Sequence, residues 1–298
     1  MPRRLALPFL FAFAAAGAAC APTAPVREAQ PPGVHPSFQV KVSGEGRPLI
    51  LIPGLACTGE VWDSTVARFQ DHYQLHVLTL GGFGGAPAFK GEMLSTVETD
   101  LAAYIRDTKL TQPVLIGHSL GAVIAYSLAA DHPELVGGVV AVDGVPFYPA
   151  LMDPGATPLS ARPFGEKMAG FLSSQDAAGR HQSNVRYATT AATDPAQQAR
   201  ITAWGDASDP STVGRAFVEL CSTDLRAKVR HIQAPLLLIA SESPGADSKT
   251  VSSLYEGQVA SVPKHRVLVA QGSHHFVMFD RPEFLFDSIQ AFLTDKSS

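Results

Sequence analysis

Six short, mostly apolar runs, separated by stretches with helical patterns, restrict the fold of this 298-residue chain more than any other feature. Apolar strands of this kind are typical of parallel sheets, because helices cover both faces of such a sheet. The segment FQVKV at 38–42 alternates apolar and polar residues instead and predicts an outer strand. The pattern therefore predicts an α/β fold with a mostly parallel central sheet. The six runs lie at 48–52, 74–80, 113–116, 136–142, 235–240 and 265–270.

Helical periodicity fills much of the sequence between these runs. In the segment 95–107, Val97, Leu101 and Ile105 fall on one helical face. Such a stripe of apolar residues is what a helix needs to pack against a sheet. Further helices are predicted at 120–131, 250–260 and 282–293.

The pattern changes between residues 145 and 230. Prolines cluster at the beginning of this segment, and alanine-rich helical stretches without a strand-like run follow them. An insertion of this kind between two strands typically forms a separate layer over one end of the sheet. We therefore predict a helical cap at 145–230 and a core formed by 37–144 and 231–298.

The first residues have the layout of a secretory signal, with two arginines, an apolar stretch at 5–16 and then small residues. This stretch is short for a membrane span. We expect residues 1–19 to be a signal peptide and the protein to be exported to the periplasm or secreted. Cys20 follows Gly-Ala-Ala, which resembles the site where bacterial lipoproteins are cut and acylated. Two outcomes stay open: acylation of Cys20 with attachment to the membrane, or simple cleavage near Ala18 and a soluble product.

A proline- and alanine-rich stretch at 20–36 lacks periodicity and predicts a tether in front of the folded domain. Two further cysteines, Cys57 and Cys221, lie far apart in the sequence. An oxidising compartment would let them pair if the fold brought them together, and buried free thiols are the alternative.

Charge and residue spacing exclude two classes of function. The formal net charge is −4, and the predicted folded region contains no basic run that would hold a polyanion. We therefore expect no nucleic-acid partner. Histidine, cysteine, aspartate and glutamate nowhere show the spacing of metal ligands, so we expect no metal site and no cofactor.

Ser119 lies between two glycines in GHSLG at 117–121, between a predicted strand and a predicted helix. In this context the pattern G-x-S-x-G is typical of a nucleophile held on a sharp turn. The glycines are needed because the serine takes a strained backbone conformation and because strand and helix approach closely. The turn places the hydroxyl above the carboxyl ends of the strands, where α/β sheets bind ligands, and at the positive end of a helix.

Four motifs resemble those of the α/β-hydrolase family and occur along the chain in the family's order. The resemblance runs from about Phe38 to Leu293 and is weakest in the predicted cap. It implies a serine nucleophile, a histidine base, a carboxylate that orients the base, and two backbone N–H groups that stabilise the oxyanion. The motifs are LIPGLACTGEVW at 51–62, LTLGGFGG at 78–85, GHSLG at 117–121 and GSHHFVMFDRPEFL at 272–285.

The resemblance implies that the base follows the last strand, where His274 and His275 stand. The match of HFVMFDRP to the family pattern favours His275 as the base. His274 is then expected to face structure or solvent. His118 is expected to be a packing residue, because neighbouring residues on a tight turn point their side chains apart.

Three carboxylates are candidates for the acid, since Pro244 occupies the position where most of the family carries its aspartate. Some relatives carry the acid at the end of an earlier strand instead, and Asp143 stands at that place. We favour Asp143 and keep Asp247 and Glu242 as alternatives.

The oxyanion donors implied by the family are the backbone N–H groups of Leu55 and Leu120. The usual His-Gly of the first of these loops is Pro53-Gly54 here, which removes an imidazole but leaves the N–H of Leu55. Cys57 in the same loop is interpreted as a packing residue.

The resemblance implies a serine hydrolase that cleaves a small to medium ester, a lactone or a thioester through an acyl-enzyme. Its expected partner is a small-molecule ester, and the sequence predicts no oligomeric state. A cofactor-free perhydrolase or a carbon–carbon bond hydrolase would use the same serine and histidine, so both stay open. A non-catalytic exported binding module is the other alternative, motivated by the displaced acid and by Pro53.

Overall fold

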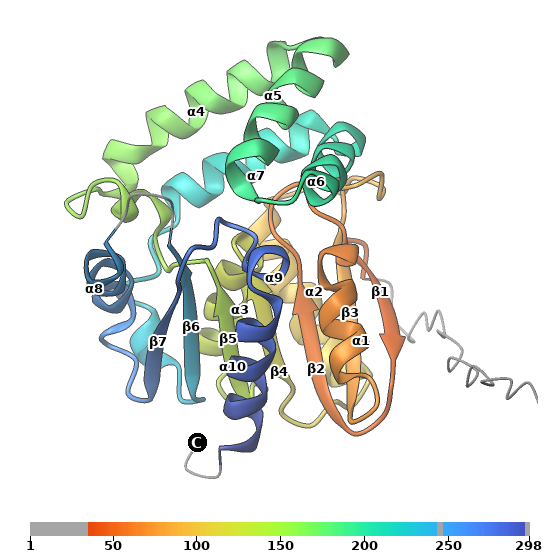
Figure 1. The fold of residues 1–298 in the computed structure, drawn as a ribbon, viewed down its shortest axis with the longest axis vertical. Helices are drawn as coiled ribbons and strands as arrows, with labels where there is room; N and C mark the ends of the chain where they lie inside the picture. Colours follow the sequence, from red (N-terminus) through yellow and green to blue (C-terminus); the bar gives the residue numbers. More distant parts are fainter. Residues whose placement is uncertain (1–34, 243–246, 296–298) are drawn as a thin grey trace, which may run out of the picture.

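The computed structural model describes residues 35–242 and 247–295, and its centre is a seven-stranded sheet with the order β1-β3-β2-β4-β5-β6-β7 (Figure 1). Only β1 runs antiparallel to its neighbour, β3, and all other paired strands in this sheet are parallel. The predicted mostly parallel α/β sheet is therefore confirmed, with the alternating segment at its edge. The strands are β1 (Phe38–Ser43), β2 (Arg47–Ile52), β3 (Tyr73–Leu80), β4 (Val114–His118), β5 (Gly138–Val142), β6 (Leu236–Ser241) and β7 (His265–Ala270).

The apolar strands are buried on both faces, as their composition requires. Alternate residues of β2 belong to two different core clusters: Ile50 and Ile52 pack on one side of the sheet, and Leu49 and Leu51 pack on the other. Because side chains of a strand point alternately to its two faces, both faces must carry helices.

Helices of the core cover both faces. The first face carries α2 (Met93–Asp107), α3 (Leu120–Asp131) and α8 (Ser248–Val259), and the second carries α1 (Asp63–Phe69) and α10 (Pro282–Thr294). The short helix α9 (Val277–Asp280) follows β7 and precedes α10, and single turns of 3-10 helix lie at η1 (Gly59–Trp62), η2 (Tyr148–Leu151) and η3 (Val229–His231).

Four helices lie between β5 and β6 in the sequence, and we call them the cap helices. Figure 1 shows them gathered beyond one end of the sheet, where β5 ends and α9 begins. They form two packed pairs, α4 with α7 and α5 with α6. Each begins with a proline in its first turn after a Thr or Asp whose side chain caps the helix, except α5, which has the Asp cap alone. The cap helices are α4 (Pro158–Ser174), α5 (Ala177–Ala191), α6 (Pro195–Ala207) and α7 (Pro210–Ser222).

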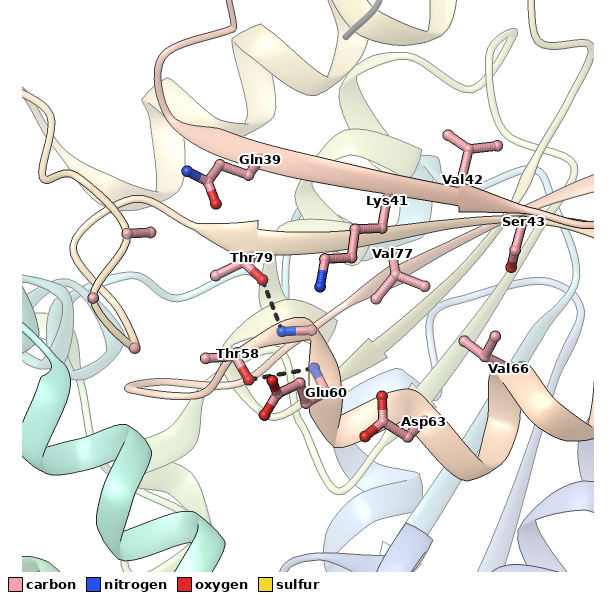
Figure 2. A pocket seen from close by; sticks show the side chains of 14 residues that line it. Gln39, Lys41, Val42, Ser43, Thr58, Glu60, Asp63, Val66, Val77 and Thr79 are labelled. Carbon is pink, nitrogen blue, oxygen red and sulfur yellow. Dashed lines mark hydrogen bonds between the residues drawn. The ribbon is translucent and has the colours of Figure 1, made fainter. Parts of the chain in front are cut away.

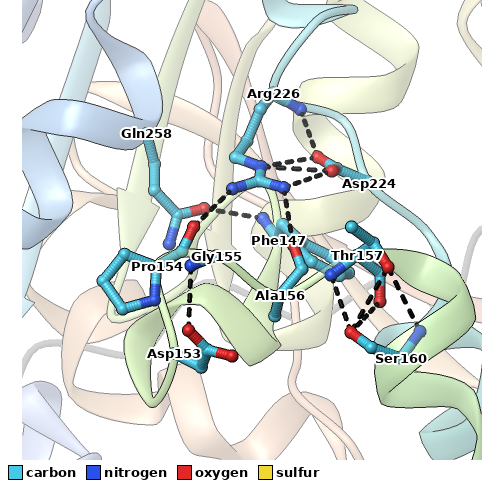
Figure 3. Close-up of polar contacts among 10 residues, drawn as sticks. All are labelled: Phe147, Asp153, Pro154, Gly155, Ala156, Thr157, Ser160, Asp224, Arg226 and Gln258. Carbon is cyan, nitrogen blue, oxygen red and sulfur yellow. Dashed lines mark hydrogen bonds and ion pairs between the residues drawn. The ribbon is translucent and has the colours of Figure 1, made fainter.

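A cluster around Arg226 ties together the two segments that connect the cap helices to the sheet (Figure 3). The guanidinium of Arg226 pairs with Asp224 at 2.6 Å and donates to the backbone oxygen of Ala156 at 3.0 Å. It also lies 4.8 Å from the ring centre of buried Phe147, whose N–H donates to Gln258 of α8 at 2.8 Å. The segments before and after the cap helices are therefore held to each other and to the core.

The expected signal peptide at 1–19, Cys20 and nearly all of the expected tether at 20–36 lie outside the described residues. Within 35–242 and 247–295, no helix combines the length and the apolarity that a membrane crossing requires. Cys57 and Cys221 are both buried free thiols, so the pairing that the sequence left open does not form.

Gly121, in the first turn of α3, marks the closest approach between this helix and the sheet. A Cβ atom at Gly121 would lie 2.3 Å from the backbone oxygen of Ile52, and one at Gly117 would lie 2.3 Å from the oxygen of Gly121. Backbone atoms cannot yield as a flexible side chain can, so only glycine fits at either position.

We expect Gly121→Ala to lower the free energy of unfolding by about 3 kcal/mol or more, because it overpacks a backbone contact. The matched control is Gly257→Ala, also inside a helix, where an added Cβ meets no atom within 4 Å. That variant should gain about 0.5–1 kcal/mol from the better helix former. Urea unfolding measures both, and equal stability of the two variants would contradict the close packing of α3.

Candidate active site

Ser119 occupies the sharp turn between β4 and α3. Its backbone has φ 52° and ψ −115°, a region that costs a non-glycine residue about 1–3 kcal/mol. The turn is held by a hydrogen bond from the Ser119 N–H to the oxygen of Val142 at 3.0 Å. A Cβ atom at Gly54 would lie 3.2 Å from the Ser119 Cβ, so the loop after β2 passes directly beside the serine. Ser119 is partly exposed, which leaves its side chain accessible.

His275 and Asp143 meet at the same end of the sheet, although 132 residues separate them. His275 follows β7, and Asp143 is the first residue after β5. The imidazole Nδ1 lies 2.6 Å from the Asp143 Oδ2, and the Asp143 side chain is buried with 6% of its surface exposed. The structure therefore brings together two of the three side chains that the sequence analysis favoured for catalysis.

The Asp143 carboxylate is held through both of its oxygens. Oδ1 accepts hydrogen bonds from the Ser241 N–H at 2.8 Å and from the Tyr255 hydroxyl at 2.7 Å, which leaves Oδ2 for His275. Burial acts to raise the pKa of Asp143, but the hydrogen bond and charge of His275, with the donors from Ser241 and Tyr255, lower the pKa below its ordinary value. Asp143 is therefore ionised at neutral pH.

The alternative carboxylates have other partners. Asp247 caps α8 by accepting from the N–H and the hydroxyl of Thr250, both at 3.0 Å. Glu242 accepts from the Gly272 N–H at 3.0 Å and from the Ser248 hydroxyl. Among the described residues neither carboxylate is hydrogen bonded to His275. Pro244, where most of the family carries its acid, lies outside the described residues.

His274 does not face the serine turn. Its Nδ1 lies 3.0 Å from Asp280 and 3.1 Å from the hydroxyl of Thr193, which precedes α6. These contacts match the expectation that His274 faces structure, and they fix the loop that carries His275.

His118 is buried beside the paired His275. Its Nε2 donates to the backbone oxygen of His275 at 3.1 Å, and the ring centres of the two histidines are 4.6 Å apart. Burial, followed by the charge of His275, lowers the pKa of His118 to about 3, so this imidazole is neutral. It packs as expected and also supports the backbone of the loop after β7.

The two residues expected to supply oxyanion donors flank the serine. Leu120 is the first residue of α3, where backbone N–H groups have no partner within the helix. Leu55 lies in the loop that passes beside Ser119, and its oxygen accepts from the Cys57 thiol at 3.4 Å. Burial raises the pKa of Cys57 to about 12, so Cys57 is a protonated thiol that packs in the loop.

The end of α5 lies against the loop that carries His275. The Phe276 N–H donates to the oxygen of Ala191 at 3.1 Å, and the Thr193 N–H donates to Asp280 at 2.8 Å. One turn earlier, Tyr187 is 47% exposed, yet desolvation and then the nearby Cys57 and Asp143 raise its pKa.

Apolar residues of the predicted cap at 145–230 divide into two groups. Phe147 and Trp204 are buried in packing, and Met152, Phe164 and Phe171 are exposed with 44–61% of their surface accessible. The exposed residues belong to the cap segment, so they are available to a ligand or to solvent.

A cavity of about 440 Å³ lies elsewhere, against β1, β3, η1 and α1 (Figure 2). Its acidic residues already have partners: Glu60 accepts from the Trp204 indole at 3.0 Å, and Asp63 pairs with Arg200 at 2.7 Å. Neither the serine turn nor His275 lines it. Within the described ranges, no three His, Cys, Asp or Glu side chains are grouped to hold a metal ion.

The chain is similar to curated esterases. It is 25% identical over 269 residues to a pimeloyl-(acyl-carrier protein) methyl ester esterase of Aeromonas hydrophila, covering 86% of this chain and 99% of that protein. It is 26% identical to the enzyme of the same name from Yersinia enterocolitica, covering 81% of this chain and 92% of that protein.

Solved structures share the fold. An enol-lactonase from Burkholderia xenovorans LB400 matches with a TM-score of 0.74 at 17% identity, covering 87% of this chain and 96% of that chain. A hydrolase from Pseudomonas aeruginosa matches with a TM-score of 0.73 at 17% identity, covering 87% of this chain and 94% of that chain. The family model of the alpha/beta hydrolase family matches residues 49–288. This match, together with the sheet order and the serine turn between β4 and α3, shows that the chain belongs to the α/β-hydrolase family.

Proposed function

We propose that the protein is a serine hydrolase that cleaves small to medium carboxylic esters through an acyl-enzyme. The observation that carries the proposal is the 2.6 Å contact between His275 Nδ1 and a buried, ionised Asp143, at the end of the sheet where Ser119 is held in its strained turn. A serine hydroxyl is a weak nucleophile at neutral pH and requires such a base.

In the proposed reaction, Asp143 accepts a hydrogen bond from the Nδ1–H of His275 and stays ionised, which holds the tautomer whose Nε2 lone pair can take the proton of Ser119. The serine oxygen attacks the ester carbonyl, and the negative charge on the carbonyl oxygen is stabilised by the N–H groups of Leu55 and Leu120. His275 then donates its proton to the leaving alcohol. Water attacks the acyl-enzyme with His275 as base, which releases the acid and restores Ser119.

The names of the relatives support an ester as the substrate class. Two similar proteins are named methyl ester esterases, and a structural neighbour is named an enol-lactonase. We infer that esters with small alcohols, including lactones, are the substrates. The binding-module alternative was motivated by the displaced acid and by Pro53. The Asp143–His275 pair weakens the first motive, because it supplies a carboxylate that follows β5.

Ser119→Ala should abolish hydrolysis of p-nitrophenyl acetate, with a loss of at least about 10³-fold in kcat, because the nucleophile is removed. The matched control is Ser253→Ala, at an exposed position of α8, which should keep wild-type turnover. Steady-state kinetics and thermal unfolding of both variants test this. Turnover retained in a folded Ser119→Ala protein would rule out the mechanism.

Replacing the acid separates the three candidate carboxylates. Asp143→Asn should lower kcat by about 10³–10⁴-fold with little change in KM, because the amide no longer stabilises the imidazolium or its correct tautomer. Asp247→Asn should leave kcat within about threefold, since asparagine caps a helix as well as aspartate. Glu242→Gln should behave like Asp247→Asn. A larger loss in either control than in Asp143→Asn would assign the acid elsewhere.

A further inference from the structure

Tyr255 reaches the candidate acid from α8, the helix predicted from the sequence at 250–260. Its hydroxyl donates to Asp143 Oδ1 at 2.7 Å, while Asp143 Oδ2 lies 2.6 Å from His275. Among the described residues, the other hydrogen-bond donor to this oxygen is the Ser241 N–H, at 2.8 Å. Tyr255 therefore provides the only side-chain hydroxyl among the described contacts of this buried anion.

The hydroxyl of Tyr255 is held in place by packing. Tyr255 is 7% exposed and belongs to the core cluster between α8 and the sheet, with Val251 and Val259 of the same helix. Burial, and then the charge of Asp143, raise the pKa of Tyr255 well above its ordinary value. The phenol is therefore neutral. In this contact its O–H is the hydrogen-bond donor and the carboxylate is the acceptor.

Two donors on one oxygen restrict the rotation of the carboxylate. The Ser241 N–H is fixed in the backbone at the end of β6, and the Tyr255 hydroxyl approaches from a helix, so together they hold Oδ1. With Oδ1 held, Oδ2 is directed to the imidazole. Loss of one donor leaves a buried charge with poorer compensation and a less defined orientation.

We propose that Tyr255 is a positioning residue for catalysis, which fixes the Asp143 carboxylate against His275 and withdraws part of its negative charge from the imidazole. The proposal rests on the proposed serine hydrolase function.

The groups around the carboxylate determine the sign of the electrostatic effect on His275. His275 and Tyr255 bond to it directly, and His118 and Tyr187 lie within reach of its charge. Without the Tyr255 donor, more negative charge remains on the carboxylate facing His275. That charge stabilises the imidazolium, so the acid limb of the kcat/KM profile should move to higher pH.

The test compares two buried tyrosines whose hydroxyls donate to consecutive residues. Tyr255→Phe removes the donor to the Asp143 carboxylate, and Tyr126→Phe removes the donor to the backbone oxygen of Gly144 at 3.0 Å. For Tyr255→Phe we expect kcat on p-nitrophenyl acetate to fall by about 10- to 100-fold with KM unchanged, from the loss of a hydrogen bond to a charged group. The acid limb should also shift upward. Tyr126→Phe should change kcat by less than about threefold and leave the acid limb in place.

Equal behaviour of the two variants, in kcat and in the acid limb, would overturn the proposal, because a structural role alone affects both tyrosines alike. If Tyr255→Phe fails to fold, fluorinated tyrosines at position 255 keep the test, because they preserve shape and strengthen the O–H donor. The acid limb should then move to lower pH as the donor strengthens, and an unchanged limb would overturn the proposal.

The control for the underlying function is Ser119→Ala. If that variant retains turnover, the serine mechanism itself is wrong. If Ser119→Ala is inactive while Tyr255→Phe is indistinguishable from Tyr126→Phe, the mechanism stands and only the role of Tyr255 is wrong.

Discussion

The buried negative charge of Asp143 is the constraint on which the rest of the site depends. A carboxylate removed from water must be paired and hydrogen bonded, and here its partners come from three separate elements: the loop after β7, the end of β6 and α8. These elements are brought together only when the parallel sheet is complete. The position of the imidazole relative to the acid therefore depends on the assembled core and not on a single loop.

The same helix that contacts the acid also contacts the cap segment. One turn after Tyr255, Gln258 accepts from the N–H of Phe147, three residues beyond Gly144. On the other side of the site, α5 ends against Phe276, the residue after His275. The cap segment is thus anchored at two points beside the proposed catalytic residues: through Phe147 to α8, and through the end of α5 to the loop after β7.

Local pattern was sufficient to predict the sheet and the sharp turn at Ser119, whereas His275 was proposed from the resemblance to the family. Burial of the sheet on both faces requires apolar runs in the strands, and the close approach of α3 to the sheet requires the glycines around Ser119. Both requirements are therefore visible in the sequence. Asp143 was favoured over Asp247 and Glu242 through the same resemblance, and local pattern alone does not reveal its hydrogen bond to His275, which joins residues 132 positions apart. The contact of Tyr255 with Asp143 could not be predicted for a related reason. Tyr255 lies on the apolar face of α8 like an ordinary core residue, and only the fold directs its hydroxyl to Asp143.

The most direct measurement of the central claim is the site of reaction with a fluorophosphonate, read by intact-mass and peptide mass spectrometry. The account predicts one adduct per chain, on Ser119. A folded protein that stays unlabelled, or that is labelled at a different residue, would contradict it.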